Sequence, residues 1–142
     1  MTFQFQALGT VIPCDSPAEC ARYFVDHFSF EPAAQLDWYV SLTHASLPGH
    51  FLDFIQFGSE ACPPHFRERP GMVFAFVVED ANRELARLKA AELKVAKEMV
   101  DEPWGQRLFR IAGPENLLIE IVQHIEPEAN WMAAHSQEPV DR

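Results

Sequence analysis

The apolar residues in the first part of the chain change from strand-like to helix-like spacing. Residues 7–14 form a mostly apolar run that predicts a strand. Ser16 and Pro17 then mark a helix start, because Ser caps a first turn and Pro fits the first helical position. Apolar side chains follow at helical spacing at Cys20, Tyr23, Phe24 and Phe28. The pattern predicts a helix that ends near residue 27 and packs on a sheet.

Strand-like runs follow this helix, and the same order of elements then begins again. Residues 38–43 and 51–57 are β-rich and flank a Pro-Gly turn, which predicts a hairpin. After a proline-rich connection, a strand is predicted at 72–78 and a helix from Asp80 to about residue 91, followed by strands at 95–100, 107–111 and 117–123. A unit that recurs after about 65 residues indicates internal duplication.

This order predicts an α+β fold of two βαβββ repeats that form a cupped mixed sheet with helices on the outer face. We expect one domain over residues 1–125, with repeats at about 5–58 and 70–124. Residues 126–142 are predicted to be a C-terminal tail with a docking turn near Trp131. Because one helix covers only one face of each sheet, the opposite faces are free to line a cup.

Alternation along the strands predicts which side chains enter that cup. Leu117, Ile119 and Ile121 form an aliphatic set that should pack under the helices, so Glu120 should point into the cup. Val73, Ala75 and Val77 are expected to line the cup on one strand. Leu8, Thr10 and Ile12 are expected to do so on another. These side chains predict an apolar pocket with a few polar anchors, as is typical of small-ligand sites.

Charge and composition exclude several classes of partner. The net charge is -10, with 11 Lys and Arg against 21 Asp and Glu, so we expect no nucleic-acid partner and no anionic membrane surface. No stretch approaches the roughly 20 apolar residues of a membrane span, and residues 1–7 do not resemble a signal segment. We therefore expect a soluble, cytoplasmic protein.

The three cysteines support a reducing compartment. Cys14, Cys20 and Cys62 are odd in number and lack CxxC spacing, so the sequence predicts neither a disulfide framework nor a zinc site. Cys14 precedes a helix start, where a thiol pKa can be lowered, and a nucleophilic role is one interpretation. A small buried residue is the favoured one.

Three stretches of the second half, at residues 78–81, 103–107 and 114–120, resemble the vicinal oxygen chelate superfamily of glyoxalase I, extradiol dioxygenases and bleomycin-resistance proteins. The resemblance extends over roughly residues 5–124. Members usually carry Asp-Pro-Asp-Gly before the last strand, whereas this chain has Gly-Pro-Glu-Asn at 113–116. Asn116 can replace glycine where the turn needs a positive φ, so we expect the turn to be retained.

The resemblance also implies where a metal would bind in the metal-dependent members. Their four ligand positions correspond to Leu8, Asp53, Val73 and Glu120. Leu and Val cannot coordinate a cation, and two carboxylates seldom hold a transition metal alone. The chain is therefore expected to be closer to the metal-free bleomycin-resistance branch, with no cofactor. Asp53 and Glu120 are weak candidate ligands in the alternative that a divalent metal binds.

The favoured hypothesis is a homodimeric binding protein that sequesters an amphipathic small molecule in the apolar cup. The alternative is a glyoxalase-like lyase or isomerase with Glu120 as general base. A third is a dimer scaffold in which Glu120 pairs with an arginine. Whether Arg107 or Arg110 faces the cup is open. The expected ligand-binding residues are Leu8, Thr10, Trp38, Asp53, Val73, Ala75, Trp104, Arg107 and Glu120, with the two tryptophans as stacking candidates.

Overall fold

The computed structural model describes residues 2–4, 6–59, 61–62 and 72–135. The chain divides into two compact units. The first comprises Met1–Gly71 with Pro114–Asn116, and the second comprises Met72–Gly113 with Leu117–Arg142. The proline-rich connection expected near residue 65 and the last seven residues of the expected tail lie outside the described residues.

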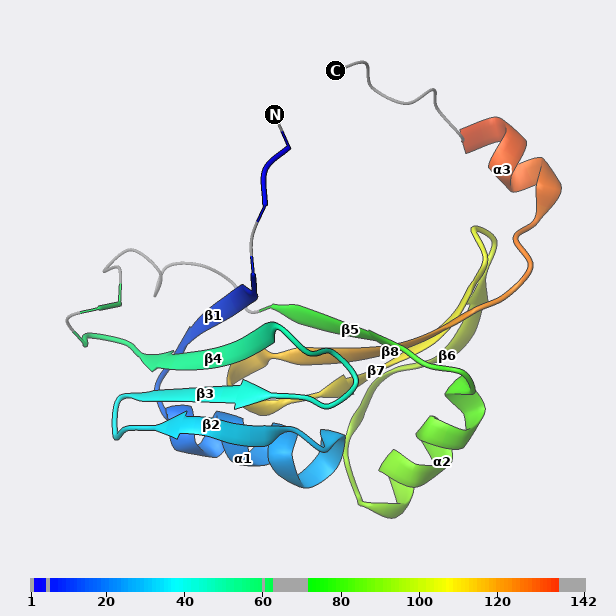
Figure 1. The fold of residues 1–142 in the computed structure, drawn as a ribbon. Helices are drawn as coiled ribbons and strands as arrows, with labels where there is room; N and C mark the ends of the chain where they lie inside the picture. The colour runs from blue at the N-terminus through cyan, green and yellow to red at the C-terminus, as the bar shows by residue number, and fades with distance from the viewer. Residues whose placement is uncertain (1, 5, 60, 63–71, 136–142) are drawn as a thin grey trace. The chain divides into compact units, whose positions relative to one another are not determined.

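The first unit is a four-stranded sheet with one long helix. Its elements are β1 (Leu8–Cys14), α1 (Pro17–Phe28), β2 (Glu31–Gln35), β3 (Tyr39–Thr43) and β4 (His50–Gln56). The strand order is β1-β4-β3-β2, with β1 parallel to β4 and the other neighbours antiparallel. Helix α1 lies along one face of this sheet (Figure 1), which leaves the other face without a helix from this unit.

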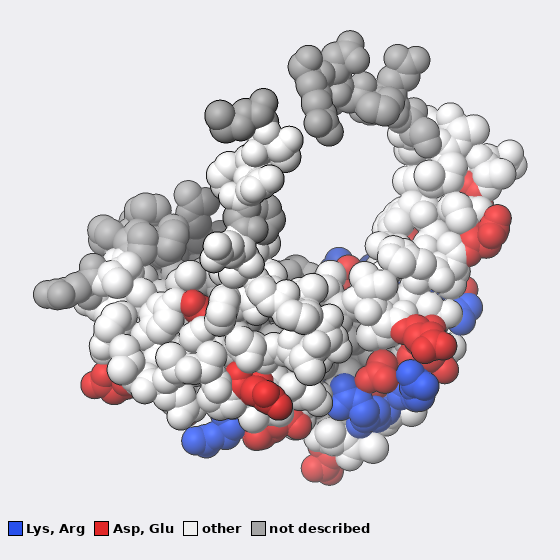
Figure 2. Space-filling view, viewed as in Figure 1, with Lys and Arg blue, Asp and Glu red and all other residues white. Residues whose placement is uncertain are grey.

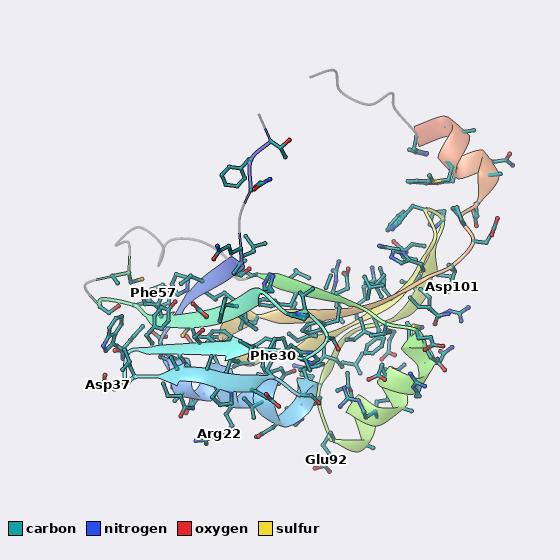
Figure 3. The ribbon with its side chains drawn as sticks, in the orientation of Figure 1. Arg22, Phe30, Asp37, Phe57, Glu92 and Asp101 are labelled. Carbon is teal, nitrogen blue, oxygen red and sulfur yellow. The ribbon has the colours of Figure 1, made fainter. Side chains whose placement is uncertain are left out.

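Helix α1 forms where the sequence predicts it, and for the predicted reasons. The Ser16 hydroxyl accepts a hydrogen bond from the backbone N–H of Glu19 at 3.3 Å, and Pro17 occupies the first turn. Phe24 is fully buried, and its ring centroid lies 5.5 Å from that of Phe54 on β4 and 5.6 Å from that of Phe30, which Figure 3 labels. These aromatic contacts hold α1 on the sheet.

The second unit repeats this plan. Its elements are β5 (Val73–Val77), α2 (Ala81–Ala90), β6 (Val95–Glu102), β7 (Gln106–Ala112), β8 (Leu118–His124) and the short α3 (Ala129–His135). The strand order is β5-β8-β7-β6, with β5 parallel to β8. The α+β class and the two βαβββ units predicted from the sequence are confirmed. The turn η2 (Pro114–Asn116) interrupts this unit and belongs to the first one.

Strand β8 shows which face of the second sheet α2 covers. Ile119 and Ile121 are buried, as is Leu117 just before the strand. Gln123, on the same face, accepts a hydrogen bond through Oε1 from the backbone N–H of Ala81 at the start of α2, at 3.0 Å. Glu120 points to the opposite face, as alternation predicted.

The C-terminal segment docks through a helix rather than a single turn. The Trp131 ring on α3 lies 5.5 Å from the ring of Trp104, and it stacks on His135 at 4.2 Å between ring centroids. In the described part of the tail, Trp131 thus contacts the turn between β6 and β7.

Charged side chains gather most densely around α2. Lys and Arg lie beside Asp and Glu there (Figure 2), and Arg87 forms an ion pair with Glu84 at 2.8 Å. Helix α2 thus presents a face of mixed charge to solvent. Among the described residues, no helix is both long and apolar enough to cross a bilayer.

Candidate functional site

The helix-free face of the second sheet carries a polar row between two apolar rows. Strand register aligns Ala75 on β5, Glu120 on β8, Arg110 on β7 and Lys97 on β6. On either side, aligned positions hold aliphatic side chains. On β5, β8 and β7 these lie two residues from the polar row and so share its face, whereas β6 is irregular on both sides of Lys97. These flanking rows are Val73, Leu118 and Ala112 on one side, and Val77, Val122, Leu108 and Val100 on the other.

An ion pair forms the centre of the polar row. The Arg110 Nε donates to the Glu120 Oε2 at 2.7 Å, and the two side chains are 36% and 14% exposed. Lys97 stands next to Arg110 in register, at a point where β6 is irregular on both sides. The half-buried pair holds the guanidinium in place within an apolar surface.

The edge of this face is apolar and open to solvent. Val73 is 50% exposed and Val77 is 62% exposed, and both lie on the edge strand β5. Both valines therefore leave half or more of their surface exposed to solvent. An apolar ligand group could therefore gain stability by covering them, at about 25 cal/mol per Å² of apolar area.

The helix-free face of the first sheet carries a second carboxylate at the equivalent position. Asp53 on β4 aligns with Val11 on β1 and Ser41 on β3, and it is only 8% exposed. Its Oδ2 accepts a hydrogen bond from the Tyr39 hydroxyl, whereas its Oδ1 has no hydrogen-bond partner among the described residues. Burial and the hydrogen bond to Asp53 raise the pKa of Tyr39 to about 12.

Asp53 and Glu120 are thus related by the duplication. Each lies on the last strand of its unit's sheet, next to the unit's first strand, and each points to the helix-free face. Their partners differ, since a phenol satisfies one carboxylate and a guanidinium the other. The two acidic positions singled out from the sequence therefore lie on corresponding strands of the two units but have different partners.

The expected placement of Leu8 and Thr10 is wrong. Both share a face with Ile12, which aligns with Phe54 and is buried on the side that α1 covers. The Thr10 Oγ1 lies 3.2 Å from the Nε2 of His50 on that side. Because β1 runs parallel to β4 in this register, Val11 rather than Thr10 accompanies Asp53 on the helix-free face.

Arg107 and Arg110 lie on opposite faces of the second sheet. Arg107 shares a face with Phe109, on the side of α2, and its Nε and Nη2 donate to the two carboxylate oxygens of Asp101 at 2.7 and 3.0 Å. The hydrogen bond from Arg107 lowers the pKa of Asp101, which Figure 3 labels on β6. Arg107 was one of the expected ligand-binding residues, but Arg110 is the arginine that lies beside Glu120.

The two expected stacking residues lie in turns outside the strands. Trp38 precedes β3, is partly exposed, and has its ring 5.7 Å from that of Tyr39. Trp104 lies in the turn between β6 and β7, and its indole N–H donates to the Oε1 of Gln106 at 2.8 Å. Both rings keep exposed surface, and the Trp104 ring also contacts the tail through Trp131.

The donor set on these faces does not fit a metal ion. Asp53 has Val11 and Ser41 as its in-register neighbours, and its Oδ2 is already bound by Tyr39. Glu120 is bound by a guanidinium, whose positive charge opposes a cation. Among the described residues, neither Asp53 nor Glu120 belongs to a group of three or more His, Cys, Asp or Glu side chains that could hold a metal ion, and a catalytic transition metal needs about three protein ligands.

Comparisons with known proteins agree with this fold. A structure from Nocardioides titled glyoxalase/bleomycin resistance protein/dioxygenase is similar with a TM-score of 0.73 at 14% identity, over 89% of this chain and 87% of that one. Lactoylglutathione lyase from Agrobacterium tumefaciens is similar with a TM-score of 0.66 at 18% identity, over 82% of this chain and 91% of that one. TnmS3, an antibiotic binding protein from Streptomyces sp. CB03234, is similar with a TM-score of 0.66 at 16% identity, over 87% of this chain and 98% of that one.

The search of curated proteins gave no match. The sequence signature of one family, described as the Glyoxalase/Bleomycin resistance protein/Dioxygenase superfamily, matches residues 7–121. This match spans most of the chain, from the start of β1 to the middle of β8. The chain belongs to the Glyoxalase/Bleomycin resistance protein/Dioxygenase superfamily.

Proposed function

We propose that this chain binds an amphipathic small molecule on the helix-free face of its second sheet, without a metal ion at that face. The observation that carries the proposal is the register of that face, where the Glu120, Arg110 and Lys97 row lies between two aliphatic rows. Arg110 supplies the positive charge of this row, and an anionic group on the ligand would complement its guanidinium. Its apolar part covers Val73 and Val77.

Arg110 is the anchor in this arrangement. A guanidinium has five N–H donors, and the ion pair with Glu120 is made through Nε, so the terminal nitrogens are available to a ligand carboxylate or phosphate. Glu120 acts as a positioning residue, because it restricts the rotamers of Arg110 before the ligand arrives. Such preorganisation lowers the entropic cost of binding.

The alternative, a lyase or isomerase with Glu120 as general base, is less favoured. A carboxylate that already accepts a charge-assisted hydrogen bond from Arg110 is a poor proton acceptor until that bond is broken. Among the described residues, Asp53 and Glu120 also belong to no three-donor group that could hold a Lewis acid to stabilise an enolate. One of the similar structures is an antibiotic binding protein, which offers a parallel for small-molecule binding.

A thermal-shift panel tests the proposal directly. The probes are 8-anilinonaphthalene-1-sulfonate as an anionic amphiphile, S-hexylglutathione as a thiol adduct, and bleomycin as a cationic peptide antibiotic. A ligand that binds only the folded chain raises the unfolding midpoint by mass action. We expect the anionic probes to raise it, and EDTA to leave that effect unchanged.

Two variants assign the effect to the proposed face. Arg110→Met removes the anchor, and we expect at least a tenfold loss of affinity for the anionic probes. Arg87→Met is the matched control, because Arg87 is an exposed arginine in a surface ion pair on α2. Equal affinities in the wild type and Arg110→Met, or stabilisation by bleomycin alone, would contradict the proposal.

We further propose that the chain forms a homodimer. Each sheet ends in unpaired edge strands within its own unit, and exposed strand edges favour self-association. Light scattering coupled to size-exclusion chromatography should give about twice the chain mass of 16.2 kDa. A mass equal to one chain at micromolar concentration would refute the dimer without affecting the ligand proposal.

A further inference from the structure

The first unit contains a cluster of soft and hard metal-binding groups away from both sheet faces discussed above. Cys14 ends β1, Cys20 lies in the first half of α1, and Glu115 belongs to the turn η2. The two sulfur atoms and a carboxylate oxygen lie within 4.8 Å of one another. Among the residues that the structure describes, these three side chains make up the one group of this kind.

Glu115 is fixed in place by the start of α1. Its Oε1 accepts a hydrogen bond from the backbone N–H of Asp15, and its Oε2 accepts one from the backbone N–H of Ser16 at 3.0 Å. The Cys20 thiol also donates to Oε2, at 3.3 Å. Glu115 adopts φ 50°, which is uncommon for a residue with a side chain, and the three hydrogen bonds hold it there.

The cluster is buried at the sulfurs and open at the carboxylate. Cys14 is 1% exposed and Cys20 is fully buried, whereas Glu115 is exposed. An ion can therefore approach from the carboxylate side and reach two sulfurs that water reaches poorly. The hydrogen bond with Cys14, together with burial, raises the pKa of the Cys20 thiol.

We propose that Cys14, Cys20 and Glu115 bind a thiophilic divalent cation such as zinc. Zinc lies at about 2.3 Å from a thiolate sulfur and about 2.0 Å from a carboxylate oxygen. A tetrahedral ion with these bond lengths separates the sulfur from the oxygen by roughly 3.5 Å. The Cys20 Sγ and the Glu115 Oε2 are 3.3 Å apart, which is close to this sulfur-to-oxygen separation. A solvent molecule completes the fourth position.

The charges and protons of this site balance. Both thiols release their protons to solvent as two metal–sulfur bonds form, and Oε2 exchanges the thiol donor for the ion while it keeps the Ser16 N–H. Two thiolates, one carboxylate and a divalent cation give a net charge of -1. That charge lies at the N-terminus of α1, where the helix dipole favours an anion.

Cobalt titration of the reduced full-length chain tests the site. We expect one equivalent of Co²⁺ to bind, with a thiolate-to-cobalt charge-transfer band in the near ultraviolet and tetrahedral bands in the visible, both displaced by Zn²⁺. Cys14→Ser and Cys20→Ser should each remove most of the charge-transfer intensity. Glu115→Gln should weaken binding at least tenfold. Cys62→Ser is the matched control, since Cys62 is another buried thiol outside the cluster, and it should leave the spectrum unchanged.

Several results would overturn this proposal. These are the absence of a charge-transfer band in the folded wild type, a band that survives both cysteine substitutions, or a band lost with Cys62→Ser. If circular dichroism shows that the buried cysteine variants do not fold, the cobalt affinity of Glu115→Gln decides the test, because the Glu115 side chain is exposed. An unchanged affinity in that variant would overturn the proposal. Arg110→Met should bind cobalt normally, so failure of the ligand proposal and failure of the metal site are separable.

Discussion

Removing the Tyr39 hydroxyl should expose the cost of a buried charge on the first sheet. In Tyr39→Phe, Asp53 keeps its 8% exposure but loses the hydrogen bond to Oδ2, while its Oδ1 already has no partner among the described residues. A hydrogen bond to a charged group contributes about 1.5–3 kcal/mol. We therefore expect Tyr39→Phe to lower the free energy of unfolding by about 2 kcal/mol at pH 7.

A double-mutant cycle with Asp53→Asn isolates that interaction. The neutral amide is less costly to bury than a carboxylate, so in the Asp53→Asn background the same Tyr39→Phe change should cost about 1 kcal/mol or less. Urea unfolding followed by far-ultraviolet circular dichroism measures all four variants. A loss below about 0.5 kcal/mol in the wild-type background, or an equal loss in both backgrounds, would refute this description of Asp53.

Three further predictions follow from packing and ionisation. Phe24→Ala removes the ring that packs α1 on β4, so the free energy of unfolding measured in urea should fall by about 3–5 kcal/mol. A fall of less than about 2 kcal/mol would argue against that packing. Gly105→Ala should lower the free energy of unfolding by at least about 1 kcal/mol, because residue 105 has φ 102° and the new Cβ would lie 2.9 Å from the Ile125 carbonyl oxygen. An unchanged free energy of unfolding would contradict this close approach of the tail. Tyr23 and Tyr39 each have a pKa raised to about 12 from 10.0. Spectrophotometric titration should therefore show phenolate forming near pH 12 in the folded chain and near pH 10 in the unfolded chain. The folded chain should lose stability as the pH rises between those two values. Equal titration midpoints in the folded and the unfolded chain would disprove the raised pKa of the tyrosines.

Local chemistry made the helices and most strands predictable. Ser16 with Pro17, and Asp80 before the second helix, specify helix starts through hydrogen bonds that need no tertiary contact, and both caps are present. Asn116 was expected to tolerate a positive φ, and it has φ 63°. Alternation on the last strand also identified the buried face, because its two faces differ in chemistry at Glu120.

The failures occur where the sequence carries no such contrast. β2 was not recognised as a strand, because Glu31–Gln35 is an edge strand with every residue exposed and without apolar alternation. On β1, apolar side chains occur on both faces, so the faces could not be told apart without the register to β4. Leu8 and Thr10 were therefore assigned to the wrong face.

The cysteine cluster shows a different limit. Cys14 and Cys20 are six positions apart, which matches no common metal motif, and the third group lies 95 residues beyond Cys20. The strand-to-helix turn and the return of η2 to the first unit bring these side chains together. A ligand set assembled by tertiary structure leaves no local signal in the sequence.

The location of a bound ligand tests the central claim most directly. ¹⁵N-labelled chain can be titrated with 8-anilinonaphthalene-1-sulfonate while backbone amide shifts are followed at known assignments. We predict saturable shifts centred on Ala75, Arg110 and Glu120, with α1 and α2 amides unaffected and the shifts lost in Arg110→Met. Shifts centred on the helices, or identical shifts in Arg110→Met, would show that the helix-free face of the second sheet is not the ligand site.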